Sequence, residues 1–462
     1  MTAAPATQSL TAVLARHTAG TRFAGLSDNT VHAFRRAFLD YLSCTLAGAN
    51  LPVAVAVRAW AQIEGGVPSS TVLGSDGVKL AASQAAFVNG TAAHALDFDD
   101  GQTRGSVHPG ASVFSAALAA AERDGAGMEE FICGVVAGYE VLLRIASAMH
   151  PASALQGWHN TAVAGVFGAT AAAARIARLD EEATRNALGL ASSFSGGIRQ
   201  YNRDGAEVKR LHPGKAARDG IACAGLAAEG VTGPVEALEG RDGLFRAMVD
   251  NRVDASQVLE GLGETFLIGT AYFKPYPCCR HFHAAIDAAL ELRAEEGLSL
   301  RDVAGAEIGL YRVGAHGHDH TTARNLLEAQ MSAPCAIAAA LGRGRLSAAD
   351  FDPAAFDDPD LQRLIMATRV YVDEECEAAY PVRRSGVVAL QLADGRRVER
   401  RILDPRGEGA NPLSDDDIGR KFLDNVSDVI GGDRAARLVD LVWSMDGGGD
   451  LASLVALLSR KA

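Results

Sequence analysis

The spacing of apolar residues divides the chain into regions of different character. After Ser27, which is suited to cap a helix, Val31, Phe34, Phe38 and Tyr41 recur at helical intervals. Ala-rich helical text continues through residues 81–98, 110–124, 128–148, 161–178, 181–194 and 215–229, without a repeat of fixed period. This pattern predicts a large all-helical domain.

The pattern changes after Lys274. One helix is expected over about 281–296, and the strand-like segments GAEIGLYRV, IMATRVYVDEE and VVALQLADGRRVERRIL follow it. The Asp394-Gly395 pair in the last segment is typical of a two-residue β-hairpin turn. Helical spacing returns beyond about residue 408, in KFLDNVSDVI and DRAARLVDLVWSM.

These patterns predict a mainly α protein with an inserted domain. Residues 1–272 together with 409–462 would form the all-helical domain, and residues 273–408 a smaller α+β lid domain. The cleft between two such domains is the expected ligand site.

Composition narrows the classes of partner and compartment. The 462 residues carry a net charge of −12, which disfavours binding to nucleic acid or to anionic membrane surfaces. No uninterrupted apolar run approaches the roughly 18 residues of a membrane span, and the N-terminus lacks the features of a signal peptide. We therefore expect a cytoplasmic protein, with its seven scattered cysteines present as reduced thiols.

Lysine is rare in this chain. Only six of the 44 basic residues are lysines, so each deserves inspection as a compact charge suited to carboxylate binding or proton transfer. Lys209 and Lys274 lie near other polar motifs, whereas Lys421 is expected on a helix away from the cleft.

Three histidines precede predicted helices. His108 and His212 are each followed by Pro-Gly, and His159 by Asn-Thr. A helix N-terminus favours anions and disfavours protonated imidazole, so neutral histidines there could serve as bases or as donors to a carboxylate. The alternative is that they are plain capping or packing residues.

The segment HALDFDDGQTRGSVHPG is rich in titratable groups. His94 and Asp97 are three residues apart and would share a helix face, where the aspartate could orient an imidazole or hold a proton. Asp99 and Asp100 could instead cap the next segment or bind a hard cation, although the glycine spacing of a calcium loop is missing.

The string HGHDH is the most metal-like motif. On an extended segment His316, His318 and His320 would point the same way and could bind a divalent ion. The surrounding polar, Gly-containing text favours a solvated loop.

Several motifs together resemble those of one family. They are AAFVNGTAAHALDFDD, VHPGASVFSAALAAAE, GWHNTAVAGVFGATAAAARI, EVKRLHPGKAARDG and FKPYPCCRHFHAAIDA, spread in order over roughly residues 25–345. They resemble the MmgE/PrpD family, which includes 2-methylcitrate dehydratase, cis-aconitate decarboxylase and iminodisuccinate epimerase. Gly101, where many members have Thr, and Cys278-Cys279, where the decarboxylase has a His, depart from that pattern.

The resemblance implies a homodimer without metal or organic cofactor, with its active site between an all-helical domain and an α+β lid. The family's catalytic and carboxylate-binding positions fall on Asp97, His108, His159, Lys209 and Lys274, with His212, Cys279 and His283 beside them. The lysines would bind carboxylates, the two catalytic histidines would transfer protons, and Asp97 would orient a histidine or act as the base.

The function implied is that of a lyase or isomerase acting next to a carboxylate of a small di- or tricarboxylic acid. These reactions create or quench negative charge at carbon, which requires an acid–base pair and stabilising cations. A 2-methylcitrate dehydratase-like activity is the main expectation, with decarboxylation of cis-aconitate or epimerisation of iminodisuccinate as alternatives. A metal-dependent hydrolase built on HGHDH and a non-catalytic carboxylate-binding protein remain less favoured classes.

Overall fold

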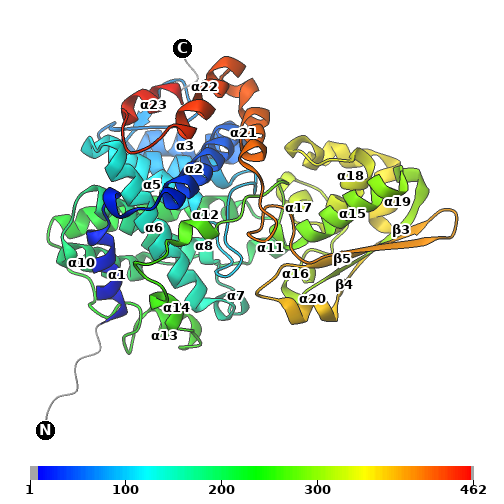
Figure 1. Ribbon diagram of the computed structural model, residues 1–462, viewed down its shortest axis with the longest axis horizontal. Helices are drawn as coiled ribbons and strands as arrows, with labels where there is room; N and C mark the ends of the chain where they lie inside the picture. Colours follow the sequence, from blue (N-terminus) through cyan, green and yellow to red (C-terminus); the bar gives the residue numbers. More distant parts are fainter. Residues whose placement is uncertain (1–8, 459–462) are drawn as a thin grey trace, which may run out of the picture.

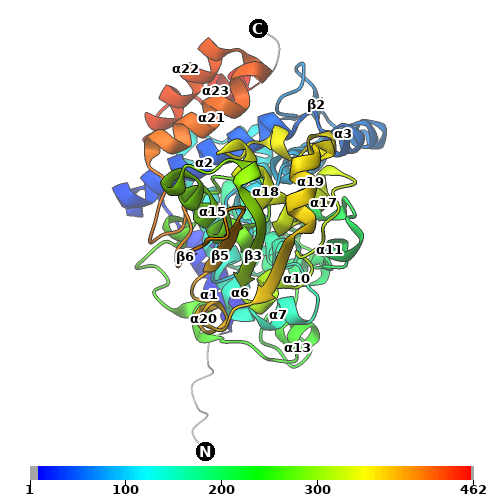
Figure 2. The same cartoon turned by 90° about the vertical axis from the view of Figure 1, so that its right-hand side faces the viewer.

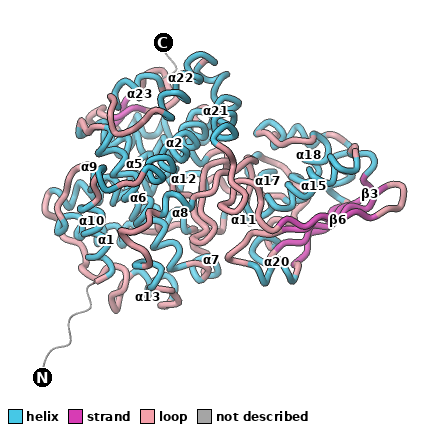
Figure 3. The backbone as a smooth tube through the Cα atoms, in the orientation of Figure 1, coloured by secondary structure: helices cyan, strands magenta, loops and turns pink. Residues whose placement is uncertain are grey.

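The computed structural model describes residues 9–458, which form two parts lying side by side (Figure 1). The larger part, here called the helical part, contains both ends of the described chain, and the smaller α+β part is built on a four-stranded sheet. The mainly α class predicted from the sequence is confirmed. Loops occupy much of the junction between the two parts (Figure 3).

The helical part is formed by two stretches of the chain. Its N-terminal stretch contains the short hairpin β1 (Ser70–Thr71) and β2 (Lys79–Leu80), and the helices α1 (Leu10–Gly20), α2 (Asp28–Gly48), α3 (Pro52–Glu64), α4 (Ala82–His94), α5 (Gly110–Asp124), α6 (Met128–Met149), α7 (Ala152–Leu155), α8 (Asn160–Val163), α9 (Gly165–Ile176), α10 (Glu181–Phe194), α11 (Tyr201–Asp204), α12 (Val208–Ala228), α13 (Leu244–Val249) and α14 (Ser256–Leu259). The C-terminal stretch adds α21 (Asp415–Ile430), α22 (Gly432–Trp443) and α23 (Leu451–Leu457).

Local signals fix several helix ends. The Ser27 hydroxyl accepts a hydrogen bond from the Thr30 amide and caps α2, as the sequence predicts. Gly125 ends α5 in the left-handed conformation with φ of 62°, which glycine adopts without steric cost. The predicted helix over 110–124 is therefore confirmed at both ends.

Helix α6 forms the centre of the larger apolar core. It is long and apolar enough to cross a membrane by length and composition, and its entire apolar window is buried inside the protein. The helices α2 and α3 pass the same test only if they are counted together, as one span bent by 85°. Glu140 and Arg144 interrupt the apolar text of α6 and pair with each other inside the core, with 2.6 Å between Glu140 Oε1 and Arg144 Nη2.

The helices α4 and α12 cross at two glycines. A Cβ atom on Gly214 would lie 2.3 Å from the Phe87 carbonyl oxygen, and one on Gly90 would lie 2.7 Å from the Gly214 Cα. Only glycine permits this backbone approach. The crossing holds the beginning of α12 next to the end of α4, where the histidine- and aspartate-rich segment begins.

The start of helix α12 predicted from the sequence was wrong. Helix α12 begins at Val208, not near residue 215, so Pro213 lies inside it and His212 is not at its N-terminus. Proline removes one backbone hydrogen bond from a helix. Packing of α12 against α4 and α9 offsets the loss of this hydrogen bond. The sequence pattern of α12 does not indicate these packing partners, so it does not predict the helix before Pro213.

The α+β part consists of a sheet with strand order β4-β3-β5-β6 and helices packed against it (Figure 2). Its strands are β3 (Val303–Leu310), β4 (Thr368–Val372), β5 (Gly386–Leu392) and β6 (Arg397–Ile402), and its helices are α15 (His283–Glu296), α16 (Arg312–Ala315), α17 (Leu326–Gln330), α18 (Ala333–Arg343), α19 (Pro359–Met366) and α20 (Glu374–Ala379). Strand β3 pairs parallel with β4 and antiparallel with β5. The predicted hairpin joins β5 to β6, although residues 393–396 make its connection longer than two residues.

The two parts have separate apolar cores. One core includes side chains from α1 through α12 and from α21 to α23, and the other includes side chains between Tyr276 and Leu392. Helix α21 returns to pack against α2.

Lys421 corrects an expectation from the sequence. It lies on α21 but is buried at the junction, where its Nζ is 2.6 Å from Asp40 Oδ1 and donates to the carbonyl oxygens of Phe98 and Lys274. The helical spacing around residue 421 indicates the helix but not this partner, because Asp40 is 381 residues away in sequence. Lys421 is a structural residue that holds the chain next to Lys274.

We predict that Lys421→Met lowers the free energy of unfolding by about 3–5 kcal/mol, because it leaves the Asp40 carboxylate buried without its cation. Urea denaturation measures this change. Lys79→Met is the matched control, since Lys79 is 51% exposed in its pair with Glu122 and should change stability by less than about 1 kcal/mol. Equal effects of the two substitutions would contradict this view of Lys421.

Candidate active site

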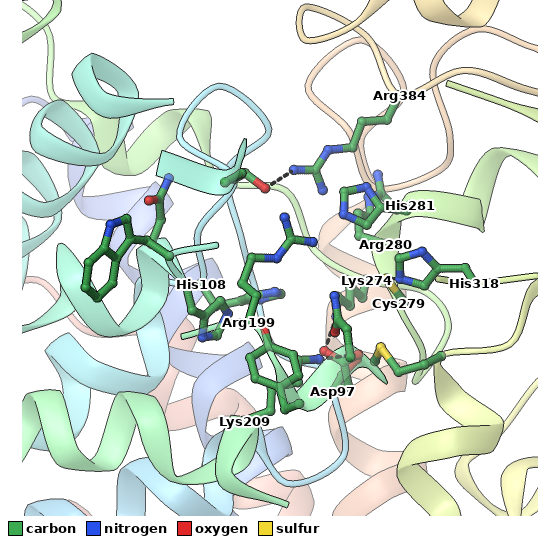
Figure 4. Close-up of a pocket in the computed structure, with 18 of the residues that line it drawn as sticks. Asp97, His108, Arg199, Lys209, Lys274, Cys279, Arg280, His281, His318 and Arg384 are labelled. Atoms are coloured by element: carbon green, nitrogen blue, oxygen red, sulfur yellow. Dashed lines mark hydrogen bonds and ion pairs between the residues drawn. The ribbon is translucent and has the colours of Figure 1, made fainter. Parts of the chain in front are cut away.

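A cavity between the helical and α+β parts collects polar side chains from both (Figure 4). The charged and titratable residues that line it are Asp97, His108, His159, Arg199, Tyr201, Lys209, Tyr272, Lys274, Cys279, Arg280, His281, His318 and Arg384. The structure thus brings together six of the eight site residues predicted from the sequence, and the other two, His212 and His283, contact residues of the lining.

Asp97 lies at the centre of the ionic contacts. Lys209 Nζ from the first turn of α12 is 2.8 Å from Asp97 Oδ2, and Lys274 Nζ from the segment before the α+β part is 2.8 Å from Asp97 Oδ1. Lys274 also donates to the Asp97 backbone carbonyl. Asp97 has φ of 51°, an uncommon conformation for a residue other than glycine, just beyond the end of α4.

The two lysines keep Asp97 ionised. Burial alone would raise the pKa of the Asp97 carboxyl, but the charges of Lys209 and Lys274 outweigh burial and hold its pKa well below the usual range. Asp97 in turn raises the pKa of the fully buried Lys274, against the opposing effect of burial. An ionised Asp97 is already occupied by two cations, which favours a positioning role for this carboxylate over a role as base.

The other two aspartates of the segment hold its shape. Asp99 accepts a hydrogen bond from His94 Nδ1 at 2.9 Å. Asp100 accepts from the Gly110 amide at the start of α5 and from the Tyr139 hydroxyl. Both carboxylates are buried, so these bonds anchor the loop between α4 and α5 inside the helical part.

His108 is neutral and has one ring nitrogen available. Its Nδ1 donates to the Asp100 carbonyl oxygen at 2.7 Å, which leaves Nε2 as the unprotonated atom. Burial lowers the pKa of His108 to about 3, and the charge of Asp99 only partly opposes this effect. Because its ring lines the cavity, the Nε2 atom can accept a proton from a ligand there.

His159 and His212 form a second histidine pair. Their Nδ1 atoms are 2.8 Å apart, so one donates and the other accepts. Burial lowers the pKa of His212 to about 4 and holds the pKa of His159 well below its usual value. The charge of Lys209 lowers the pKa of both histidines further. His159 lines the cavity, and His212 supports it from behind on α12.

The metal-like motifs separate in the structure. His318 is buried in the cavity wall, whereas His316 is exposed and His320 is half-buried and bonds to the Thr322 carbonyl oxygen. Among the described residues, His94, Asp99 and His108 are the group whose ligand-type atoms lie within 4.8 Å of one another. Their hydrogen bonds already account for this proximity, since each histidine uses Nδ1 on Asp99 or on the Asp100 backbone.

His283 is placed behind the cavity wall. It is fully buried at the start of α15, and its Nδ1 is 2.9 Å from Arg280 Nη1. Arg280 also donates to Glu408 and lies over the Tyr272 ring, 4.6 Å from the ring centroid. His283 therefore positions Arg280 and does not itself line the cavity.

Tyr272 accounts for the glycine at position 101. The two residues exchange backbone hydrogen bonds, and a Cβ atom on Gly101 would lie 2.3 Å from the Tyr272 hydroxyl oxygen. A larger side chain at 101 would displace this ring from the cavity wall.

Sequence reasoning missed Arg384, Arg199, His281 and a cavity role for His318. Arg384 is 3% exposed, has no carboxylate within ion-pair distance in the described part of the chain, and donates to the Ser106 hydroxyl at 3.1 Å. Its Nε has no hydrogen-bond partner there. No local sequence signal marks Arg384, which is one of many arginines and is buried only because the two parts meet.

Comparison with known proteins identifies the family. The MmgE/PrpD N-terminal domain matches residues 12–256, and the MmgE/PrpD C-terminal domain matches residues 276–446. The chain belongs to the MmgE/PrpD family.

Its relatives include several decarboxylases. A cis-aconitate decarboxylase-like protein of Aspergillus oryzae is 27% identical over 91% of each chain. Human cis-aconitate decarboxylase is 26% identical over 98% of this chain and 95% of its own, and the Aspergillus terreus enzyme is 26% identical over 91% and 90%. The protein is an enzyme, a lyase of this family.

The buried neutral histidines predict a pH dependence of stability. Their folded-state pKa values lie below the unfolded value of about 6.5, so the unfolded chain binds more protons and stability is lost as the pH falls from about 6.5 towards 4. We expect His108→Gln to flatten this loss by about 1.4 kcal/mol per pH unit, the contribution of one proton.

Urea denaturation at a series of pH values measures the slope. His316→Gln is the control, because this histidine is exposed and should leave the slope unchanged. A wild-type stability that is constant between pH 6.5 and 4.5 would show that these histidines are protonated in the folded protein.

Proposed function

We propose that this enzyme decarboxylates cis-aconitate or a closely related tricarboxylic acid. The proposal rests on the charge of the cavity and on the relatives of the chain. Its decarboxylase relatives favour this reaction over the 2-methylcitrate dehydratase activity that was the main expectation from the sequence.

The single observation that carries the proposal is the excess of positively charged side chains in the cavity wall, four of which are buried. Five side chains with positive charge line the cavity, against one carboxylate, Asp97. They are Arg199, Lys209, Lys274, Arg280 and Arg384. Glu408 balances Arg280, but the remaining excess suits a ligand with two or three carboxylates.

The cations fall into two groups that can hold different carboxylates of one ligand. Lys209 and Lys274 share Asp97 on one side, and Arg384 and Arg199 lie on the other (Figure 4). Arginine binds a carboxylate in bidentate fashion and fixes its plane. A ligand clamped at both groups would have its reacting carbon between them, within the histidine-lined middle of the cavity.

Decarboxylation in such a site does not require a covalent bond between the protein and the substrate. When the carbon–carbon bond to the departing carboxylate breaks, its electron pair stays on carbon and is delocalised towards a neighbouring unsaturated carboxylate. Cations fixed in a desolvated cavity stabilise that developing charge. A protonated group must then deliver a proton to carbon, and the neutral histidines His108 and His159 can relay protons but hold few of their own at neutral pH.

The arrangement of the two parts fits a lid. Arg384 and Cys279 belong to the α+β part, whereas His108 and Lys209 belong to the helical part, so the site is complete only when the parts are together. We include in the proposal a lid role for residues 273–408 and a homodimeric, cytoplasmic, cofactor-independent enzyme, as the family resemblance implies.

The proposal is tested by incubating the purified protein in D2O with cis-aconitate, citrate, 2-methylcitrate and iminodisuccinate. Decarboxylation gives CO2 and a product with one new carbon–deuterium bond, which NMR locates. Water loss or gain would indicate a dehydratase, and deuterium exchange with inversion but without CO2 would indicate an epimerase. Ligand-induced chemical shifts without any exchange or product would indicate a binding protein.

We predict that Arg384→Gln raises KM at least tenfold for the substrate so identified, because each charge-assisted carboxylate contact contributes about 1.5–3 kcal/mol. Lys274→Ala should lower kcat/KM at least tenfold, since it also frees Asp97 from one of its two cations. Steady-state kinetics measures both changes.

Arg401→Gln is the matched control for Arg384. This arginine also belongs to the α+β part, but it pairs with Asp373 on the sheet and does not line the cavity. Arg384→Gln kinetics indistinguishable from those of the control would refute the assignment of the carboxylate site.

A further inference from the structure

We propose that Cys279 and His318 form the proton-transfer pair of the α+β part, with the Cys279 thiol as the acid that protonates the substrate carbon. The inference rests on the proposed function and assigns the group that this reaction still lacks. It goes beyond the sequence-based expectation, in which Cys279 only contacts substrate.

The two side chains are in direct contact in the cavity wall. Cys279 Sγ is 3.3 Å from His318 Nε2, and both residues are buried and line the cavity. Cys279 is the one cysteine of the described chain that lines this cavity. Its backbone amide donates to the Gln330 carbonyl oxygen, which fixes its place between Lys274 and α15.

The orphaned nitrogen of His318 favours one arrangement of the shared proton. His318 Nδ1 is buried and has no hydrogen-bond partner in the part of the chain that the structure describes. A proton on Nδ1 would be a buried donor without an acceptor, which is costly. A proton on Nε2 instead points at the Cys279 sulfur and stabilises a thiolate there.

The charges around Cys279 act in the same direction. Burial alone would raise the pKa of its thiol, but the electrostatic attraction and hydrogen bond from the His318 ring outweigh burial, and the pKa lies at about 7. The other titratable groups near this sulfur are Asp97, which raises its pKa, Lys209, which lowers it, and the neutral groups of Tyr201, Tyr311 and Cys278.

The remaining cysteines show that this environment is specific. Burial raises the thiol pKa above its usual value at every other cysteine of the chain, namely Cys44, Cys133, Cys223, Cys278, Cys335 and Cys376. None of these six lines the cavity. Burial alone therefore does not produce the acidity of Cys279.

The placement of the pair suits proton delivery to a clamped substrate. Figure 4 shows Cys279 and His318 on the side of the α+β part and His108 on the side of the helical part, with Asp97 and Lys274 between them. A ligand held by the lysines would thus face a neutral imidazole on one side and the thiol on the other.

The proton balance of the step is simple. As CO2 leaves, its bonding electron pair remains on the substrate carbon, the S–H bond of Cys279 breaks, and its proton forms the new C–H bond. The resulting thiolate accepts the hydrogen bond of His318 Nε2–H. A proton from water restores the thiol before the next turnover, so no oxidant or reductant is consumed.

The test compares Cys279→Ser and His318→Gln with wild type, using the decarboxylation assay. A thiol acid must be protonated, so wild-type kcat/KM should fall as the pH rises through about 7. We expect Cys279→Ser to lower kcat at least a hundredfold. His318→Gln should move the alkaline fall to higher pH, because it removes the group that stabilises the thiolate.

Cys335→Ser is the matched control, since this buried cysteine lies on α18 in the apolar core of the same part. It should retain wild-type kcat and its pH profile. Turnover of Cys279→Ser within threefold of wild type, with an unchanged profile, would overturn the inference and leave the decarboxylase function standing.

A second measurement needs no turnover. The rate of carboxymethylation of the Cys279 thiol by iodoacetate, followed by peptide mass spectrometry across pH, should titrate at about 7 in wild type and at higher pH in His318→Gln. Identical titrations in the two proteins would refute the pair itself. Absence of CO2 release by wild type from every acid would overturn the function, and the assigned role of Cys279 with it.

Discussion

The carboxylate of Asp97 joins three separate segments of the chain at the cavity. Asp97 follows α4, Lys209 begins α12, and Lys274 leads into the α+β part, yet the three side chains meet within 2.8 Å contacts in a buried setting. Loss of the carboxylate would leave two ammonium groups buried together without an anion, which is far more costly than loss of a surface pair. The same interaction therefore fixes the fold at the junction and sets the charge of the cavity.

The cations and the burial around the cavity also determine the protonation of the nearby histidines. A histidine near several fixed cations and away from water is held neutral, and this applies to His108, His159 and His281. Neutral imidazoles can accept and relay protons but donate them poorly at neutral pH. In such a site a group other than these histidines must donate the proton to substrate. The thiol of Cys279, on the opposite wall of the cavity, is acidic enough to do so.

Much of the fold could be read from local sequence signals, whereas the site could be read only in part. The cap at Ser27, the helix over 110–124 and the hairpin around Asp394 depend on residues close in sequence, and these elements form as predicted, although the hairpin connection is longer than two residues. Lys421 and Arg384 depend on partners far away in sequence, and their environments were not predicted. Asp97, Lys209 and Lys274 were singled out by residue type, but their grouping in one site came only from the family resemblance, because no spacing rule places residues 97 and 274 in contact.

The hydrogen bonds of Gln330 make one edge of the junction between the two parts different from the other. Its side-chain amide donates to the carbonyl oxygens of Leu96 in the helical part and of Pro277, and its carbonyl accepts from Arg210 on α12. Across the cavity, the hydrogen bonds that the described residues make between the parts run from Arg384 to Ser106 and between His150 and Tyr380. Separation along the Gln330 edge would break two bonds of one fully buried side chain, to Leu96 and Arg210, while separation along the other edge breaks bonds that are partly exposed. The two edges thus resist widening unequally, and a hinge-like motion about Gln330 costs less than a uniform parting of the two halves.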